Sequence, residues 1–229
     1  MDNSKGVILL DVCDTLFLSN TTFDFIKWYL QKNSPLKLAR LRKLTSRKSP
    51  EFWYLLLLGK LRRKDLIREK AIALLKGESA PALQSGASQF YDDFLANRKN
   101  KKVWDLLDVM VSQNPGKQRI LVSSSLDIII VEVAKRLGIE KQYASKMEMH
   151  DGKFTGRLAS DVHGQKHVII QHTLAEGAAT TFFTDNFTDL ELAKQCGAVY
   201  IVTYKQKQLQ RWSRELNPST TTYIKMFNS

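Results

Sequence analysis

The chain has 229 residues, of which 43% are hydrophobic, so it can form one large domain or a core with a smaller module. Its two cysteines are too few for a disulfide framework, and its longest apolar run, Phe52–Leu58, is too short to cross a membrane. The net charge of +12 predicts an anionic partner or a strongly solvated surface. Because the polar start Met1–Gly6 shows no signal peptide, we expect a cytoplasmic protein.

The first part of the chain predicts one strand followed by a helical block. Val7–Leu10 is a short apolar run typical of a buried parallel strand. Helical spacing or helix-start signals then mark residues 22–31, 36–44, 50–58, 65–75 and 79–95, and Ser49 and Pro50 predict the start of the third helix. This block is basic: residues 27–50 contain eight basic and no acidic side chains, and a second basic cluster spans residues 60–64.

The second part of the chain alternates between strand and helix patterns. Strands are predicted at residues 119–122, 182–184, 198–202 and 223–226, with another beginning at residues 143–144. Helices are predicted at residues 103–112, 127–137, 163–174 and 189–195. Asp151-Gly152 between two apolar runs indicates a hairpin. The alternation predicts an α/β fold with a parallel sheet.

Polar residues gather where predicted strands end. Asp11-Val12-Cys13-Asp14-Thr15 follows the first strand, Ser123–Ser125 follows the strand at 119–122, and Asp185–Asp189 follows the strand at 182–184. Lys166 opens a predicted helix after Gly164-Gln165. In an open parallel sheet, ligands bind outside the carboxyl ends of the strands, so we expect these segments to converge at one rim.

Together these four segments resemble the motifs of the haloacid dehalogenase superfamily of phosphatases, in the branch that includes phosphoserine phosphatase (subfamily IB). The family motifs are Asp-x-Asp-x-Thr/Val after a strand, a Ser or Thr ending a strand, a Lys, and a pair of Asp after another strand. The resemblance covers roughly residues 6–205. It implies a Rossmann-like core with helices on both faces of a parallel sheet, formed by residues 1–18 and 98–229. It also implies an inserted α-helical cap of the C1 type over residues 19–97.

The resemblance also assigns catalytic and metal-binding roles. Asp11 would be the nucleophile that forms an aspartyl-phosphate. Mg²⁺ would be held by Asp11, Asp185 and the backbone carbonyl of Cys13. Lys166 would neutralise charge on the nucleophile, with Asp189 holding Lys166 or a metal-bound water in place. Arg157 and Lys153 are weaker alternatives to Lys166.

A further set of residues is expected at the phosphate and substrate. Ser123 would donate a hydrogen bond to a phosphoryl oxygen, and the amides of Ser124 and Ser125 would bind the anion at the start of the next helix. Thr15 would position the nucleophile, and Asn20, where the chain enters the cap, would touch substrate. Phosphoserine-specific members carry a Glu at the position of Asn20, which argues against phosphoserine as the substrate.

Cys13 departs from the family pattern, because hydrolases of this family carry their second Asp there. That Asp protonates the leaving group, an effect worth roughly 10²–10⁴-fold, and a thiol with a pKa of about 8.5 is a poor replacement. Three interpretations remain: a substrate with a good leaving group; rescue by a neighbour, with Asp14, His163 and His167 as candidates; or a phosphate-binding pseudoenzyme. A thiolate nucleophile is disfavoured because no protein-tyrosine-phosphatase loop surrounds Cys13.

The sequence therefore predicts a magnesium-dependent phosphatase that acts on a small phosphomonoester, such as a sugar phosphate or a lipid- or glycan-linked phosphate, and favours good leaving groups. The alternative is a catalytically weak or silent binding module. In either case the basic, aromatic residues 27–70 could dock on an anionic membrane surface or an acidic protein partner, or simply form a solvated helical bundle. Nucleic acid is disfavoured because no recognised binding motif is present. If it docks on lipid, we expect a cytoplasmic protein that binds peripherally at the membrane.

Overall fold

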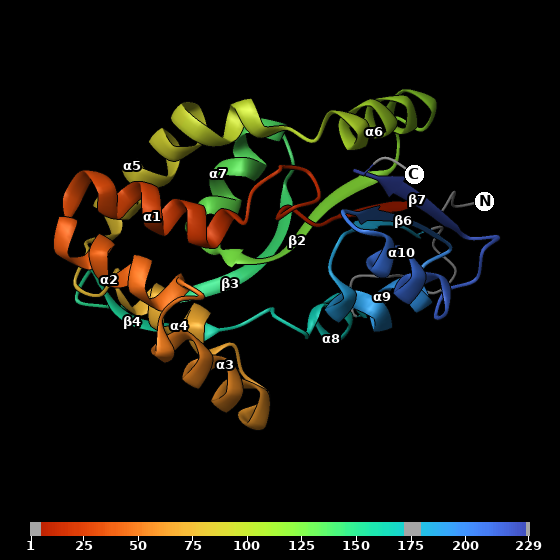
Figure 1. Ribbon diagram of the computed structural model, residues 1–229. Coiled ribbons are helices and arrows are strands. Elements are labelled where there is room, and N and C mark those ends of the chain that lie inside the picture. The colour runs from red at the N-terminus through yellow and green to blue at the C-terminus, as the bar shows by residue number, and fades with distance from the viewer. Residues whose placement is uncertain (1–5, 172–179, 228–229) are drawn as a thin grey trace.

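The computed structural model describes residues 6–171 and 180–227, which form a sheet with helices on both faces (Figure 1). The strands lie in the order β4-β3-β2-β1-β5-β6-β7. They are β1 (Val7–Leu10), β2 (Gln118–Leu126), β3 (Lys141–His150), β4 (Lys153–Ser160), β5 (Thr180–Thr184), β6 (Ala198–Thr203) and β7 (Thr221–Lys225). Neighbouring strands are parallel except for the antiparallel pair β3–β4. The predicted α/β fold with a mainly parallel sheet is confirmed.

The helices follow the predicted order closely. Between β1 and β2 lie α1 (Thr21–Asn33), α2 (Pro35–Thr45), α3 (Pro50–Arg62), α4 (Leu66–Ala73), α5 (Ala80–Phe90), a π-helical turn (Tyr91–Leu95) and α6 (Lys101–Gln113). The rest are α7 (Asp127–Leu137), α8 (Lys166–Gln171), α9 (Leu190–Gln195) and α10 (Gln206–Ser213). The helix predicted at 163–174 begins only at Lys166, and its last residues lie outside the described part of the chain. No helix among the described residues combines the length and the apolar character needed to span a bilayer.

Two hydrophobic clusters, one on each face of the sheet, make up the core. Successive side chains of a strand point to opposite faces. Ile8 and Leu10 of β1 accordingly join the cluster that contains residues of α1, α2, α4, α5, α6 and α7. Val7 and Leu9 join the other cluster, which contains Trp212 of α10 and residues of α8 and α9. Helices on both faces of the sheet are therefore confirmed.

The helical block α1–α5 is fastened to the β3–β4 hairpin by backbone hydrogen bonds. The predicted turn is present, with positive φ angles of 48° at Asp151 and 71° at Gly152. The Gly77 N–H donates to the carbonyl of Phe154 (2.9 Å), and the Ala80 N–H donates to the carbonyl of Gly152 (2.9 Å). The Phe154 N–H in turn donates to the carbonyl of Glu78 (2.9 Å). The division into a core of residues 1–18 and 98–229 and a cap of residues 19–97 stays a prediction.

Strand β2 is longer than predicted, and this changes the surroundings of the serines. The strand continues to Leu126, with irregular pairing to β3 between Val122 and Leu126, and α7 begins at Asp127. The expectation that the Ser124 and Ser125 amides open a helix is therefore wrong. The chain stays extended because partners from other elements bind it: Arg68 of α4 donates to the Ser124 carbonyl (2.6 Å), and Thr21 donates to Ser125 Oγ (2.8 Å).

Helix α3 projects from one corner of the molecule, below α2 and α4 in Figure 1. Ser49 takes the predicted position before Pro50, but its buried hydroxyl has no hydrogen-bond partner among the described residues, so the predicted side-chain cap is not formed. At the other end, a Cβ atom on Gly59 would lie 2.6 Å from the carbonyl oxygen of Lys64. The close turn from α3 into α4 therefore requires glycine at position 59.

Candidate active site

The candidate active site lies at the carboxyl ends of β1, β2 and β5. Strand β1 pairs with β2 on one side and with β5 on the other, so the chain order reverses at β1 and leaves a crevice there. Asp11 directly follows β1, and its N–H donates to the carbonyl of Phe183 in β5 (3.0 Å). Asp185 directly follows β5. The expected convergence of these segments at one rim is present.

Lys166 joins two of the predicted acidic residues in the interior. Its Nζ lies 3.0 Å from Asp11 Oδ1 and 2.8 Å from Asp189 Oδ2, and its side chain is only 3% exposed. It is the first residue of α8, which directs it into the site. The alternatives Lys153 and Arg157 lie exposed on β4. The structure thus places Lys166 at Asp11 and leaves the two alternatives at the surface.

Among the described residues, the Asp189 carboxylate has hydrogen-bond partners for one of its two oxygens. Its Oδ2 accepts hydrogen bonds from Lys166 (2.8 Å) and from Thr184 Oγ1 (2.6 Å). Its Oδ1 is buried and has no partner among the described residues. Thr184 was missed from the sequence, although it is the last residue of β5 and the rim rule could have identified it. The unpartnered oxygen is an acceptor available to a ligand or a metal-bound water.

The buried carboxyl groups carry more negative charge than Lys166 balances. Burial raises the pKa of Asp11 to about 6 against the opposing effect of Lys166. Burial, together with the charges of Asp11 and Asp14, raises the pKa of Asp185 well above its usual range. Burial would lower the pKa of Lys166, but the charges of Asp11 and Asp189 outweigh it and raise that pKa. Such an excess of buried negative charge is the environment that a divalent cation stabilises.

The donor atoms present at the rim fit magnesium. Asp11 and Asp185 supply two carboxylates, the ligand type that Mg²⁺ prefers, and the Cys13 carbonyl is a further oxygen. Thr15 Oγ1 donates to Asp185 Oδ1 (3.3 Å) and so orients that carboxylate. The described residues contain no group of three or more His, Cys, Asp and Glu side chains suited to a metal. A magnesium ion here would therefore depend on two carboxylates, backbone oxygen, water and substrate.

The Cys13 thiol is bound to α1 rather than to a base. Its Sγ lies 2.8 Å from Thr21 Oγ1 and 3.9 Å from Ser123 Oγ. Burial, followed by the charge of Asp11, raises the pKa of Cys13 to about 11. The thiol is thus protonated at neutral pH, which argues further against a thiolate nucleophile. Thr21, at the start of α1, was not identified from the sequence.

The loop after Cys13 is bent in the way that a rescuing Asp14 would require. Asp14 adopts a left-handed conformation with φ of 48°, and its N–H donates to the carbonyl of Ser19 (3.1 Å). Burial, and then the charge of Asp24, raise the pKa of Asp14. Tyr204, which follows β6 and was also missed, donates its hydroxyl to the Asp14 carbonyl (2.6 Å). Rescue by Asp14, His163 or His167 stays a prediction.

The predicted phosphate-binding serines have different surroundings. Ser123 is fully buried; its Oγ accepts a hydrogen bond from the Ser125 N–H (3.3 Å) and lies 3.9 Å from Cys13 Sγ. The Ser125 hydroxyl instead accepts hydrogen bonds from Thr21 (2.8 Å) and Thr22 (3.2 Å), so it positions α1. Asn20 is exposed and its side chain caps α1 by accepting from the Phe23 N–H (3.4 Å). Binding of phosphate or substrate by these residues stays a prediction.

The sequence of this chain matches a known protein family and several curated proteins. Residues 8–194 match the family of haloacid dehalogenase-like hydrolases. The chain is 26% identical over 156 residues to "Phosphoserine phosphatase SerB1" of Mycobacterium tuberculosis, covering 64% of this chain and 49% of that protein. It is 26% identical over 169 residues to "Putative hydrolase ML2424" of Mycobacterium leprae, covering 69% and 55% of the two chains. The chain therefore spans about half the length of the curated relatives it matches.

Solved structures share the fold. A protein of unknown function from Bordetella pertussis Tohama I superimposes with a TM-score of 0.75 at 17% identity, covering 97% of this chain and 99% of that one. A phosphoserine phosphatase in its apo form superimposes with a TM-score of 0.58 at 18% identity, covering 90% of each chain. At these identities the superpositions establish a common fold alone.

Proposed function

Because the chain belongs to the haloacid dehalogenase-like hydrolase family, we propose that it is a phosphatase whose nucleophile is Asp11. The observation that supports this most is the buried contact of Lys166 with Asp11 and Asp189 at the rim where Asp185 also lies. The substrate we propose is a small phosphomonoester, such as a sugar phosphate or a lipid- or glycan-linked phosphate.

The two oxygens of Asp11 have different surroundings. Oδ1 accepts hydrogen bonds from the Val12 N–H (2.8 Å) and lies 3.0 Å from Lys166 Nζ. Oδ2 makes neither contact, and we assign the attack on phosphorus to it. The O–P bond to Asp11 forms as the bond to the leaving oxygen breaks, and water then cleaves the aspartyl-phosphate to release phosphate and restore the carboxylate. Lys166 keeps the carboxylate ionised and orients it, while Thr184 and Asp189 fix Lys166.

The proposed magnesium ligands are Asp11, Asp185 and the carbonyl of Cys13. When bound, the ion would neutralise charge on the phosphoryl oxygens. Thr15 holds the Asp185 carboxylate in place through the 3.3 Å hydrogen bond. Ser123 lies at the same rim, and we propose that its hydroxyl donates to the phosphoryl group.

The protonated Cys13 thiol favours substrates whose leaving group needs no proton. With a pKa of about 11, the thiol is a much weaker acid than the carboxyl group that family hydrolases carry. Phosphoserine, with a poor alkoxide leaving group, fits this site badly, and Asn20 offers no carboxylate for its amine. Although one relative is named a phosphoserine phosphatase, we propose an anomeric or otherwise activated phosphate for this chain.

Aryl phosphates of graded leaving-group pKa test the proposal. With magnesium present, kcat/KM should fall steeply as the leaving-group pKa rises. Asp11→Asn should abolish turnover and the acid-stable trapping of phosphate on the protein. The matched control Asp105→Asn, on exposed helix α6, should change neither. Equal turnover across the series would indicate a rescuing acid, and turnover that survives Asp11→Asn would overturn the proposal. Phosphate binding without turnover would instead support the silent module.

A further inference from the structure

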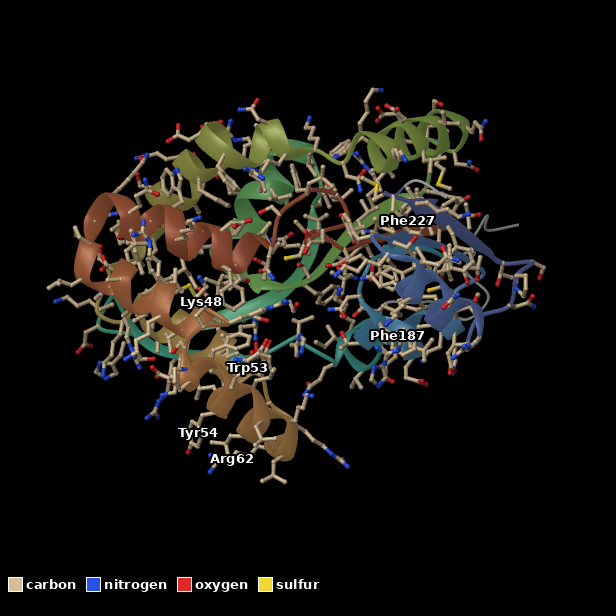
Figure 2. The ribbon with its side chains drawn as sticks, viewed as in Figure 1. Lys48, Trp53, Tyr54, Arg62, Phe187 and Phe227 are labelled. Atoms are coloured by element: carbon tan, nitrogen blue, oxygen red, sulfur yellow. The ribbon has the colours of Figure 1, made fainter. Side chains whose placement is uncertain are left out.

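Helix α3 presents an apolar face to solvent. Trp53, Tyr54, Leu57 and Leu61 are 55%, 64%, 72% and 81% exposed, and we call these four side chains the α3 patch. Trp53, Leu57 and Leu61 are spaced by four residues, which places them along one side of the helix, and Tyr54 lies beside them. Figure 2 shows Trp53 and Tyr54 on the projecting helix.

The α3 patch lies away from the side by which α3 packs on the rest of the molecule. That packing uses the opposite side, where Leu55 and Gly59 are buried and α3 contacts α4 and α2. The polar atom of Trp53 is already satisfied, because its Nε1–H donates to the carbonyl of Arg47 (2.8 Å). This hydrogen bond holds the indole at the edge of the patch. Contiguous exposed apolar side chains of this kind mark interaction sites on soluble domains.

Basic side chains lie at both ends of α3, before and after the α3 patch. We call this set the basic rim, and its members are Arg47, Lys48, Lys60, Arg62, Arg63 and Lys64, all of them exposed. Within the described ranges none of the six forms an ion pair with a carboxylate. Glu51, the acidic residue of α3, is bound by Arg40 of α2. The positive charge of the rim is therefore uncompensated within the described chain.

We propose that the α3 patch and the basic rim dock the protein on an anionic lipid surface. Tryptophan, tyrosine and leucine side chains enter the boundary between headgroups and acyl chains, while lysine and arginine meet lipid phosphates. The overall charge of +12 adds long-range attraction to such a surface. Because α3 projects from a corner of the molecule, its outer face can meet a flat surface without obstruction by other helices (Figures 1 and 2).

The inner side of α3 lines a cavity that also borders two residues close in sequence to residues of the candidate active site. This cavity of about 470 Å³ is bounded by Leu56 and Lys60 of α3, Phe23 of α1 and His163. Phe23 lies two residues after Thr21, which contacts Cys13, and His163 lies three residues before Lys166. Docking through α3 would bring this cavity close to the lipid. The docking itself does not depend on the proposed phosphatase activity.

Flotation with vesicles tests the proposal. The protein should float with vesicles of mixed phosphatidylglycerol and phosphatidylcholine, should not float with phosphatidylcholine alone, and should be released by high salt. The double variant Leu57→Glu/Leu61→Glu should weaken vesicle binding by about tenfold or more. Its matched control is Val109→Glu/Val131→Glu, which adds the same charge at sites 53% and 51% exposed on α6 and α7 and should retain binding more strongly.

A second pair of variants distinguishes the effect of the basic rim on vesicle binding from the effect of the overall net charge. Lys48→Gln/Arg62→Gln, at two rim positions labelled in Figure 2, should reduce the salt dependence of binding. Lys101→Gln/Lys102→Gln on α6 removes the same charge and should have a smaller effect. Circular dichroism and turnover of a soluble aryl phosphate should be unchanged in the patch variant, so that failure of docking is distinguishable from failure of the phosphatase proposal.

Four outcomes would overturn the proposal. The unaltered protein could fail to float with anionic vesicles, or the patch and control variants could bind equally well. Alternatively, sedimentation could show a patch-dependent dimer, or immobilised polyglutamate could retain the protein in a patch-dependent way, without any vesicle binding. Those last results would assign the α3 patch to a second copy of the chain or to an acidic protein.

Discussion

At the scale of single residues, the site is arranged around the neutral Cys13 thiol, 2.8 Å from Thr21 Oγ1. Replacing Cys13 with Asp would supply the missing acid, so we expect kcat/KM for aryl phosphates with poor leaving groups to rise by about 10²–10⁴-fold. Substrates with the best leaving groups should gain little. Stopped assays across the leaving-group series measure this difference.

Cys13→Ser is the control for that experiment, because a hydroxyl fills the same place but is no stronger an acid than the thiol. It should leave the dependence on leaving-group pKa unchanged. An equal gain for Ser and Asp would contradict the explanation. If Asp produced no gain while the fold was retained, the rescue by Asp14, His163 or His167 would become the better explanation.

Lys166 should contribute both to turnover and to the free energy of unfolding, because it is the buried cation between Asp11 and Asp189. We expect Lys166→Met to abolish turnover and to lower the free energy of unfolding by about 3–5 kcal/mol, because two buried carboxylates lose their partner. Urea unfolding measures the loss. Lys194→Met removes exposed ion pairs with Glu191 and Glu215 and should cost under about 1 kcal/mol.

The same variant has a predicted pH dependence. The folded-state pKa of Asp11 already lies above its unfolded value, at about 6, and removal of Lys166 raises it further. A carboxyl group with a raised folded pKa destabilises the fold as pH increases from its unfolded pKa to its folded one. The deficit of Lys166→Met should therefore be smaller near pH 5 than near pH 8. A deficit that is constant with pH would contradict this account.

The sequence predicted the acidic residues and Lys166 better than the groups that hold them. Asp11 and Asp185 follow strands, so the rim rule alone placed them together. Thr21 and Tyr204 were missed because an isolated threonine or tyrosine carries no motif. Their roles depend on contacts between segments that are distant in the chain, such as the 2.6 Å hydrogen bond from Tyr204 to the Asp14 carbonyl.

At the scale of secondary-structure elements, Arg68 connects helix α4 to the sheet. It is 6% exposed and donates to Asp161 Oδ2 (2.7 Å), to the Ser124 carbonyl (2.6 Å) and to Ser145 Oγ (3.2 Å). We expect Arg68→Met to lower the free energy of unfolding by about 1–3 kcal/mol, because buried acceptors lose their donor. Arg136→Met, which breaks only partly exposed ion pairs, should cost under about 1 kcal/mol.

The Arg68 variant should also alter acid unfolding. Burial would raise the pKa of Asp161, but the hydrogen bond and the charge of Arg68 more than offset it and lower that pKa. The resulting stabilisation is present above the unfolded pKa of about 3.9 and is lost as pH falls through the folded pKa. Chemical unfolding at a series of pH values should thus show that the free energy of unfolding falls less steeply at acid pH in Arg68→Met than in the unaltered protein. An unchanged steepness would show that the ion pair does not contribute.

Most elements were predictable from the sequence because periodic apolar residues mark them. Helix α10 was missed because its eight residues include just two apolar side chains, Leu209 and the buried Trp212, too few for a periodic pattern. Strand β2 was predicted too short because Ser123–Ser125 are polar and their extended conformation depends on Arg68 and Thr21. The hairpin turn at Asp151-Gly152 was predictable because its conformation requires residues that tolerate positive φ.

At the scale of the whole molecule, the buried negative charge predicts stabilisation by ligands. Magnesium and phosphate together should raise Tm, because a ligand that binds only the folded state at about 100 times its Kd adds roughly 2.7 kcal/mol. Differential scanning fluorimetry with each component alone and both together measures the effect. Asp185→Asn should remove the magnesium-dependent part and also raise the basal Tm, since it relieves repulsion with Asp11 and Asp14. An equal magnesium response in Asp185→Asn would place the ion elsewhere.

Residues 77–80 of the helical block α1–α5 are joined to the β3–β4 turn, and we call this line of contact the seam. Three backbone hydrogen bonds along this seam, and the Arg68–Asp161 pair at the other end of β4, fasten the block to the sheet. Thr21 and Thr22 of α1 also donate hydrogen bonds to Ser125 of β2, so the block is attached to the sheet at more than one place. Cavities of about 470 and 440 Å³ both border Phe23 of α1, which lies two residues after Thr21, the residue that contacts Cys13. Because Phe23 borders both cavities, we expect the size of its side chain to determine how much room they offer to a molecule bound beside α1.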